Sequence, residues 1–432
     1  MSSGSADSRH DVSPERDAAP DVPLRRNRGF QLLWTGSVFA FLGKEIAELA
    51  YPLVVLAVTG SPGWAGAFGG VQIFTSLLCG VPAGELADRY DRRRLLLCVE
   101  ALRALATGSV VAAFLLDSVS LAHLLAVAVV VGAAQPLGGS TRMLLVRSLV
   151  PPRQLTAALT QEEVRSHAAA LTGPPLGGAL YAVAQVVPFL VTAFSFTASL
   201  VLTLFVRPPV EAPHAPMRAD DKEPFVARMT VGLRALWSRP TLRAGTLFAA
   251  AMNTVTAPVI LTVVVRLREQ GMSSTAIGFT TMGLAVGGLA GTVLVAPLHR
   301  LLGPGVLMLW LGGTAFVLIG SLAAPWGRWW PTLALFLLGL GGPSMRVLVD
   351  ILIFRQVPDE QRGRAVAACM TVFGAGASLG VFAAGQLLEH ASGAVAVLVL
   401  AGVLAAAWCV GLRTRELRRA QWPEEHEAAR AG

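Results

Sequence analysis

Residues 84–94 read Gly-Glu-Leu-Ala-Asp-Arg-Tyr-Asp-Arg-Arg-Arg and join two long apolar stretches. The hydrophobic core of a soluble protein does not require so basic a loop between two apolar segments. In a polytopic membrane protein, a short arginine-rich loop stays on the cytoplasmic side. The glycine, Gly84, would let helix backbones approach closely, and the acid among the arginines, Asp88, indicates a contact as well as a topology signal. The segment therefore predicts an integral membrane protein and points to a transporter.

The composition supports this class. The chain has 432 residues, of which 54% are hydrophobic and 14% charged, whereas soluble domains carry roughly 25% charged residues. The formal net charge of +8 does not indicate a nucleic-acid partner, because the basic residues lie in short pieces between apolar segments rather than on one aromatic-interleaved face. Contact with anionic lipid, and the retention of basic loops on one side of the membrane, explain these basic residues better.

Twelve apolar stretches are long enough to cross a bilayer as helices, which need about 20 residues each. They lie at residues 30–57, 64–83, 93–116, 120–141, 155–181, 186–206, 244–265, 274–297, 302–324, 329–349, 364–388 and 391–412. With both termini in the cytoplasm, all but six of the 35 Lys and Arg residues fall on the cytoplasmic side. We therefore expect a multi-pass protein of the cell membrane with both ends inside.

The longest hydrophilic interruption divides these segments six and six. We expect five parts along the chain: a disordered cytoplasmic tail at 1–29, a six-helix bundle at 30–206, a cytoplasmic linker at 207–243, a second six-helix bundle at 244–412, and a cytoplasmic tail at 413–432.

The two halves also match each other at a constant offset of 207 residues. The matched pairs are Gly84 with Gly291, Pro151 with Pro358, Gly173 with Gly380, and Gly178 with Gly385. Pseudo-symmetric halves with a substrate path between them near the midplane are a known transporter plan.

At this point the chain resembles the major facilitator superfamily. Its segment 84–94 is similar to that family's loop between spans two and three, G-x-L-a-D-r-x-G-r-r-r, with Asp91 where glycine is usual. Residues 51–62 and 362–364 resemble the branch that contains the enterobactin exporter and related macrolide-type exporters. The resemblance implies an all-α membrane fold of twelve helices in two bundles, and a secondary transporter of small molecules.

The resemblance also implies a gating role for Gly84, Asp88, Arg89 and Arg92. Asp88 could accept hydrogen bonds from the N-terminus of a facing helix, or pair with an arginine, in one state and release it in the other. The alternative is that these charges only fix topology. Val295 stands at the offset partner of Asp88, so any such latch is one-sided.

The fifth span contains Gly173-Pro174-Pro175-Leu176-Gly177-Gly178. The prolines remove backbone donors and bend a helix, and the glycines permit close helix packing. Gly173, Pro174, Gly177 and Gly178 resemble the end of the fifth-span motif of exporters in this superfamily, although Ala169 stands where an upstream glycine is usual. The motif favours export over uptake, and a merely kinked structural helix is the alternative.

Charges inside spans are costly and face a partner or a wet cavity. Lys44, Glu45 and Glu48 lie near the middle of span one, with Lys44 and Glu48 on one helical face. We expect this cluster to line the central cavity and one glutamate to carry a proton. An ammonium partner holds a carboxyl in its charged form, so the less paired glutamate is the better carrier, and we expect this to be Glu45. A buried structural ion pair is the alternative.

Neutral polar residues in the spans, Gln72, Gln135 and Asn253, are candidates for the cavity wall, with hydrogen bonding between helices as the alternative reading of each. Glu100 and Arg103, three residues apart, are expected to form a local pair. The charges at 162–165 are expected at the membrane interface.

The chain has no phosphate-cradling G-x-x-x-x-G-K-[ST] motif, no metal-ligand spacing and no nucleophile elbow. We therefore expect no enzyme activity, no cofactor and no metal. The expected function is secondary active efflux, as a proton-coupled antiporter, of a small hydrophobic or amphipathic compound such as a drug, secondary metabolite or siderophore. A proton-coupled uptake symporter and a transport-inactive scaffold or sensor remain alternatives. The expected partners are the small-molecule substrate, protons and the lipid bilayer, and the chain is expected to work as a monomer.

Overall fold

The computed structural model describes residues 23–207 and 225–418, and within these ranges it is helical, with no strand. The N-terminal half comprises α1 (Arg28–Thr59), α2 (Pro62–Arg89), α3 (Arg92–Leu115), α4 (Leu121–Leu149), the 3-10 helix η1 (Pro152–Gln154), α5 (Leu155–Val183) and α6 (Val187–Phe205). The C-terminal half comprises α7 (Phe225–Trp237), α8 (Pro240–Thr256), α9 (Val259–Glu269), α10 (Ser274–Leu301), α11 (Pro304–Ser321), α12 (Trp330–Gln356), α13 (Asp359–His390), α14 (Gly393–Arg413) and α15 (Arg415–Arg418).

Each predicted span falls on a helix, or, for residues 244–265, on the successive helices α8 and α9. In the described part of the chain, nine helices are long and apolar enough to cross a membrane, with α8 and α9 counted together. A tenth is α2 if its two segments, bent by 49° between Gly80 and Pro82, form one span. The two other long helices are α1 and α5, which carry ionisable residues within their length.

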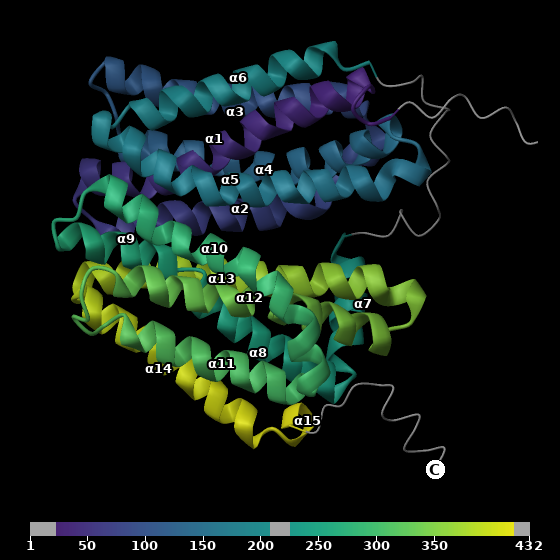
Figure 1. Cartoon of the computed structure of the whole chain (residues 1–432), viewed down its shortest axis with the longest axis vertical. Coiled ribbons are helices and arrows are strands. Elements are labelled where there is room, and N and C mark those ends of the chain that lie inside the picture. Colours follow the sequence, from purple (N-terminus) through teal and green to yellow (C-terminus); the bar gives the residue numbers. More distant parts are fainter. Residues whose placement is uncertain (1–22, 208–224, 419–432) are drawn as a thin grey trace, which may run out of the picture.

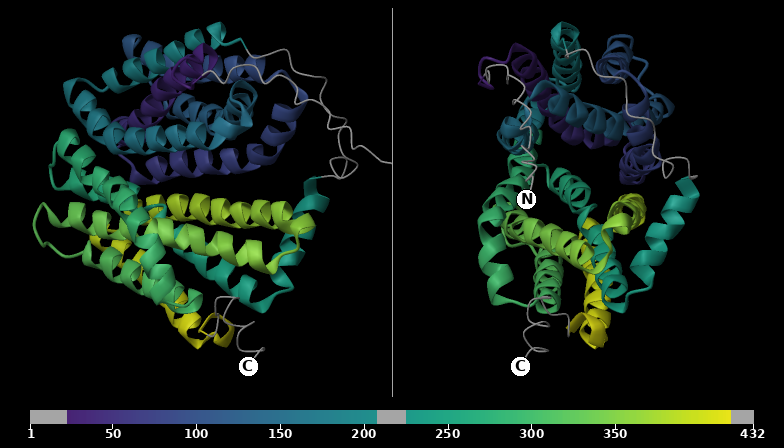
Figure 2. Two further views of the ribbon diagram at one scale, coloured as in Figure 1. Left: turned by 45° about the vertical axis from the view of Figure 1, so that its right-hand side comes forward. Right: turned by 90° about the vertical axis from the view of Figure 1, so that its right-hand side faces the viewer.

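The two halves form separate bundles that lie one above the other in Figure 1 and Figure 2. Two of the matched glycine pairs occupy equivalent places. Gly173 of α5 lies against α1, and Gly380 of α13 lies against α8. Gly178 of α5 lies against α10, and Gly385 of α13 lies against α2. These contacts are what duplicated halves related by pseudo-symmetry would make.

Close contacts between the halves lie toward one end of the molecule. A Cβ on Gly66 would be 2.6 Å from the Cα of Gly385, and the Ser378 hydroxyl donates to the carbonyl of Gly70 at 2.8 Å. We call this the contact end. The segment 84–94 lies at the other ends of α2 and α3, and we call that the basic end. The halves are thus held together away from the arginine-rich loop.

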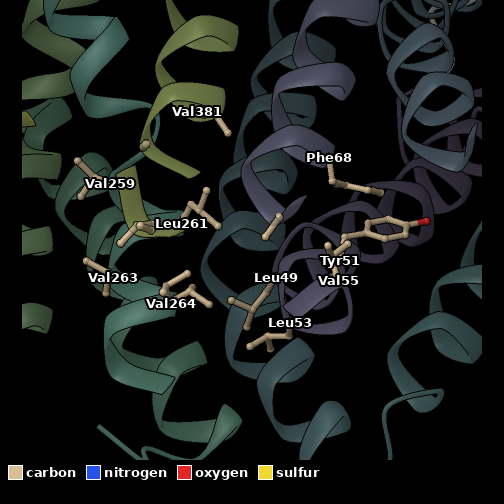
Figure 3. Close-up of a cluster of buried hydrophobic side chains, with 14 of the residues drawn as sticks. Leu49, Tyr51, Leu53, Val55, Phe68, Val259, Leu261, Val263, Val264 and Val381 are labelled. Carbon is tan, nitrogen blue, oxygen red and sulfur yellow. The ribbon is translucent and has the colours of Figure 1, made fainter. Parts of the chain in front are cut away.

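The largest apolar core also lies near these contacts and draws on both halves, as Figure 3 shows with Leu49 and Phe68 on one side and Val259 and Val381 on the other. The Tyr51 ring stacks on Phe68 with centroids 4.7 Å apart. Lipid supplies no hydrophobic driving force between membrane helices, so this cluster joins the bundles through close van der Waals packing.

Two of the expected connecting segments contain ordered structure. Residues 1–22 lie outside the described residues, but Leu24 is buried and Asn27 caps α1 by accepting from the amide of Phe30 at 3.0 Å. The expectation of disorder is wrong for residues 23–29, because a capped helix start is anchored by the core beneath it. The linker at 207–243 contains α7, whose Gly232 packs against the carbonyl of Arg364.

Candidate functional site

A cavity of about 410 Å³ opens among α1, α3, α4 and α5 of the N-terminal half. Its polar lining includes Lys44, Glu45, Arg103, Gln135, Arg142, Glu162 and Glu163, and its apolar lining includes Phe41 and Met143. Ionisable groups are expensive in a bilayer unless they face one another or water, and here they gather around one space.

The α1 cluster forms as expected but with a different pairing. Lys44 Nζ lies 2.9 Å from Glu45 Oε1 and 2.8 Å from Glu48 Oε1. The expectation that Glu45 lacks this partner is wrong, because the flexible four-carbon stem of lysine reaches its sequence neighbour as well as the residue one turn away. The two acids differ in burial instead: the Glu45 side chain is 16% exposed and that of Glu48 is 45% exposed.

The Glu100 carboxylate on α3 is fully buried and pairs with an arginine on another helix. Arg142 Nη2 on α4 lies 2.6 Å from Glu100 Oε1, whereas Arg103 Nη1 is 3.7 Å from the same oxygen. The expected local pair is therefore secondary to one between helices. The sequence interpretation missed Arg142 because it ended the span at residue 141, while α4 continues for two more turns.

The charges at the start of α5, which the sequence places at the membrane interface, contribute to the cavity wall through Glu162 and Glu163. Arg165 is buried and forms an ion pair with Glu162 one turn earlier. The aromatic ring of Phe41 lies under both Arg165, at 4.7 Å, and Arg142, at 5.6 Å. Cation–π contacts of this kind stabilise guanidinium groups away from water.

The glycines of the fifth-span motif contact two different helices. A Cβ on Gly173 would overlap Glu45, and a Cβ on Gly177 would be 2.9 Å from the carbonyl of Ile46, both on α1. Gly178 and Pro174 instead lie against the start of α10 in the other half. The helix is continuous through both prolines. The motif thus joins the α1 charge cluster to the contact between the halves.

Two of the three neutral polar residues expected in the cavity wall lie there, and the third does not. Gln135 lines the main cavity, and both Gln72 and Gln135 line a small adjoining space with Lys44 and Glu48. Asn253 does not line that cavity; its Nδ2 donates to the carbonyl of Phe373 at 2.8 Å and joins α8 to α13. For Asn253 the alternative, a hydrogen bond between helices, is what the structure contains.

In the basic segment, Asp88 and Arg89 are exposed and Arg92 is half-buried. Within the described chain, the Asp88 carboxylate makes no ion pair or hydrogen bond, and a Cβ on Gly84 would meet nothing within 4 Å. The expected close helix approach at Gly84 is therefore not made here, where α2 bends away. Asp91, which replaces the usual glycine, caps α3 by accepting from the amide of Arg94 at 2.6 Å.

Comparison with known proteins agrees with this architecture. The family model described as Major Facilitator Superfamily matches residues 33–342 and, in a second match, residues 244–432. The chain belongs to this superfamily. Curated relatives include the multidrug efflux pump Tap of Mycobacterium tuberculosis, 24% identical over 91% of this chain and 95% of the relative, and that of Mycolicibacterium fortuitum, 25% identical over 83% and 89%.

Solved structures share the fold of this superfamily member. A bacterial homologue of the iron transporter ferroportin has a TM-score of 0.70 at 19% identity, covering 91% of this chain and 99% of that one. The nucleoside transporter NupG has a TM-score of 0.70 at 12% identity, covering 89% and 98%. These transporters move different substrates, so the likeness describes the scaffold and leaves the chemistry to the cavity.

Among the described residues, no group of three or more His, Cys, Asp and Glu is placed to hold a metal ion. The charged groups of α1, α3, α4 and α5 line the cavity described above.

Proposed function

We propose that the chain is a proton-coupled exporter of small amphipathic compounds that works by alternating access in the cell membrane, with both termini in the cytoplasm. The single observation that carries this is the Lys44–Glu45–Glu48 cluster, which lies in the middle of a helix and lines the cavity through Lys44 and Glu45. A carboxylate so placed can exchange a proton for a cationic substrate. The curated relatives named as multidrug efflux pumps support the direction of transport.

The two ends of the molecule support a gating cycle. If the termini are cytoplasmic, the contact end faces outward, and the structure represents the state that loads substrate from the cytoplasm. The unpartnered Asp88 then belongs to a latch that forms only when the halves rock the other way. Gly84, Arg89 and Arg92 surround it in the same segment.

Everted membrane vesicles test this function. With an acidic lumen, the wild type should concentrate a fluorescent cationic dye such as ethidium inside, and Glu45→Gln should abolish the accumulation. Glu269→Gln is the matched control, because that acid is exposed and lies outside the cavity. Dye movement out of the lumen with protons would indicate an uptake symporter, and no flux for any compound of a broad panel would indicate a scaffold.

A further inference from the structure

The cavity wall carries two opposite net charges on different helices. With every group ionised, Lys44, Glu45 and Glu48 on α1 leave one negative charge, because one ammonium bonds both carboxylates. Across the cavity, Glu100 faces both Arg142 and Arg103, so that group leaves one positive charge. The Glu162–Arg165 pair on α5 is neutral. Glu163 adds a negative charge only at the solvent-exposed mouth, where it is screened.

Arg103 holds the unbalanced positive charge. Glu100 Oε1 is taken by Arg142 at 2.6 Å, which leaves Arg103 at 3.7 Å. Its Nη2 donates to the carbonyl of Ala134 at 3.0 Å, and its guanidinium lies 5.7 Å from the ring centroid of Phe196. These contacts fix its position without neutralising it, and its side chain is only 9% exposed. A buried charge without a full counter-charge is costly.

The position of Arg103 lets it share a ligand with the α1 acids. It lines the main cavity together with Lys44 and Glu45, and the small adjoining space together with Glu48 and Gln72. A molecule between them therefore meets a net negative group on α1 and a net positive group on α3.

We propose that the substrates of this site are zwitterionic amphiphiles, with a cationic centre placed against Glu45 and an anionic group against Arg103. This inference rests on the proposed export function and names its substrate class. Phe41 and Met143 in the same wall contact the apolar part of the molecule. Arg103 is then a specificity-determining residue, and the proton exchanges with the cationic end alone.

A pair of probes that differ by one charge tests the proposal. Norfloxacin carries a piperazinium and a carboxylate at neutral pH, and its methyl ester keeps only the cation. In the vesicles described above, the KM of the wild type for norfloxacin should be at least about 10-fold lower than its KM for the ester. This ratio corresponds to about 1.4 kcal/mol. Arg103→Gln should remove the difference, and Arg103→Lys should restore part of it.

Two neighbouring glycines supply a test that leaves Arg103 in place. A Cβ on Gly138 would be 3.0 Å from Arg103 Nη2, whereas one on Gly139 would meet nothing within 4 Å. Gly138→Ala should reduce the KM ratio between the two probes, and Gly139→Ala, which adds the same methyl group to the same wall, should keep it. The two glycine variants therefore test the proposal even if Arg103→Gln does not fold.

The outcomes separate the two proposals. Equal KM values for norfloxacin and its ester in the wild type, or a ratio that survives both Arg103→Gln and Gly138→Ala, would overturn the zwitterion assignment. Transport of ethidium without transport of either norfloxacin probe would also overturn it while leaving export intact. No transport of any compound would overturn the export function itself, and the assignment with it.

Discussion

Gly173 of α5 lies directly against Glu45 of α1, so close that a Cβ at position 173 would overlap the Glu45 Cβ. The glycine of the exporter-type motif is thus the packing surface for the acid that we propose as the proton carrier. A change at one position must move the other.

Replacement of Gly173 by alanine should force α1 and α5 apart, because the overlap involves the backbone as well as the side chain of Glu45. Overpacking of this kind costs about 1–3 kcal/mol. We expect a lower midpoint of thermal unfolding in detergent and a loss of proton-driven efflux. Gly108→Ala is the control, since a Cβ there meets nothing within 4 Å, and it should leave the unfolding midpoint unchanged or raise it slightly. An unchanged midpoint for Gly173→Ala would contradict the packing described.

Glu389 at the end of α13 bridges the halves at the contact end. Its Oε2 accepts from the Ser61 hydroxyl at 2.5 Å and from the amide of Gly63 at 3.1 Å, at the N-terminus of α2. A carboxylate is favoured there by the helix dipole. Because the contact is exposed, Glu389→Gln should shift the balance between the two states by only roughly two- to five-fold. Spin labels at Arg153 and Leu301, which report separation of the halves at the basic end, should record the shift as a larger short-distance population.

Lowering the external pH should act on the same contact. Protonation of Glu389 removes its negative charge, so the stabilisation is present at high pH and is lost as the pH falls. The distance distribution of the wild type should therefore move toward that of Glu389→Gln in acid, and that of Glu389→Gln should move less. Glu269→Gln, an exposed acid of the same half, is the control and should retain the pH response. An identical pH response in Glu389→Gln would assign the effect to another group.

Loss of Glu100 should destabilise the N-terminal half strongly. The carboxylate is fully buried between Arg142 and Arg103, and removal of one partner from a buried charge group costs about 3–5 kcal/mol. Thermal unfolding of Glu100→Gln in detergent should show a large drop in the midpoint. Glu163→Gln, which alters a mostly exposed acid, should stay within about 0.5 kcal/mol of the wild type. Similar midpoints for both variants would contradict a stabilising role for the ion pair of Glu100 with Arg142.

Asp88→Asn should separate transport from stability. The carboxylate is exposed and makes no ion pair or hydrogen bond in the described chain, so the unfolding midpoint of the present state should not change. Efflux should fall, because the latch that we propose for the opposite state loses its charge. Gly84→Ala should likewise be neutral for stability, whereas Gly291→Ala should destabilise, since Gly291 packs on the carbonyl of Leu340. A stability loss in Asp88→Asn equal to that in Gly291→Ala would place a contact at Asp88 in this state.

The sequence alone predicted the elements and their grouping well. Long apolar segments fix helices because lipid leaves the backbone no other partner, and Lys44 and Glu48 could be paired because helical spacing is regular. The pair of Glu100 with Arg142 could not be found this way, since it depends on how α3 and α4 rotate against each other. The burial of Arg165 could not be found for a related reason, since it depends on how Phe41 of α1 packs against α5.

The other differences between the sequence-based expectations and the structure lie at the ends of helices. Asp91 was interpreted as a departure from a motif, and the structure shows it to be a helix cap. Leu24 lies in the polar and charged segment 1–29, which predicts a tail, yet it packs against a core made by residues far along the chain. One side chain in a polar segment is too weak a signal for hydropathy to detect.

The polarity of α1 has a consequence for biogenesis. The first helix carries a lysine and two glutamates in its middle, so its transfer into lipid is less favourable than that of its neighbours. On scales measured for insertion by the translocon, a charged residue at the centre of a helix costs about 2.5–3.5 kcal/mol. Its three charges pair with one another within α1, and α3, α4 and α5 enclose the remaining unbalanced charge around the cavity. We therefore expect the first half of the chain to assemble together during synthesis, whereas the more apolar helices of the second half can enter the bilayer one at a time.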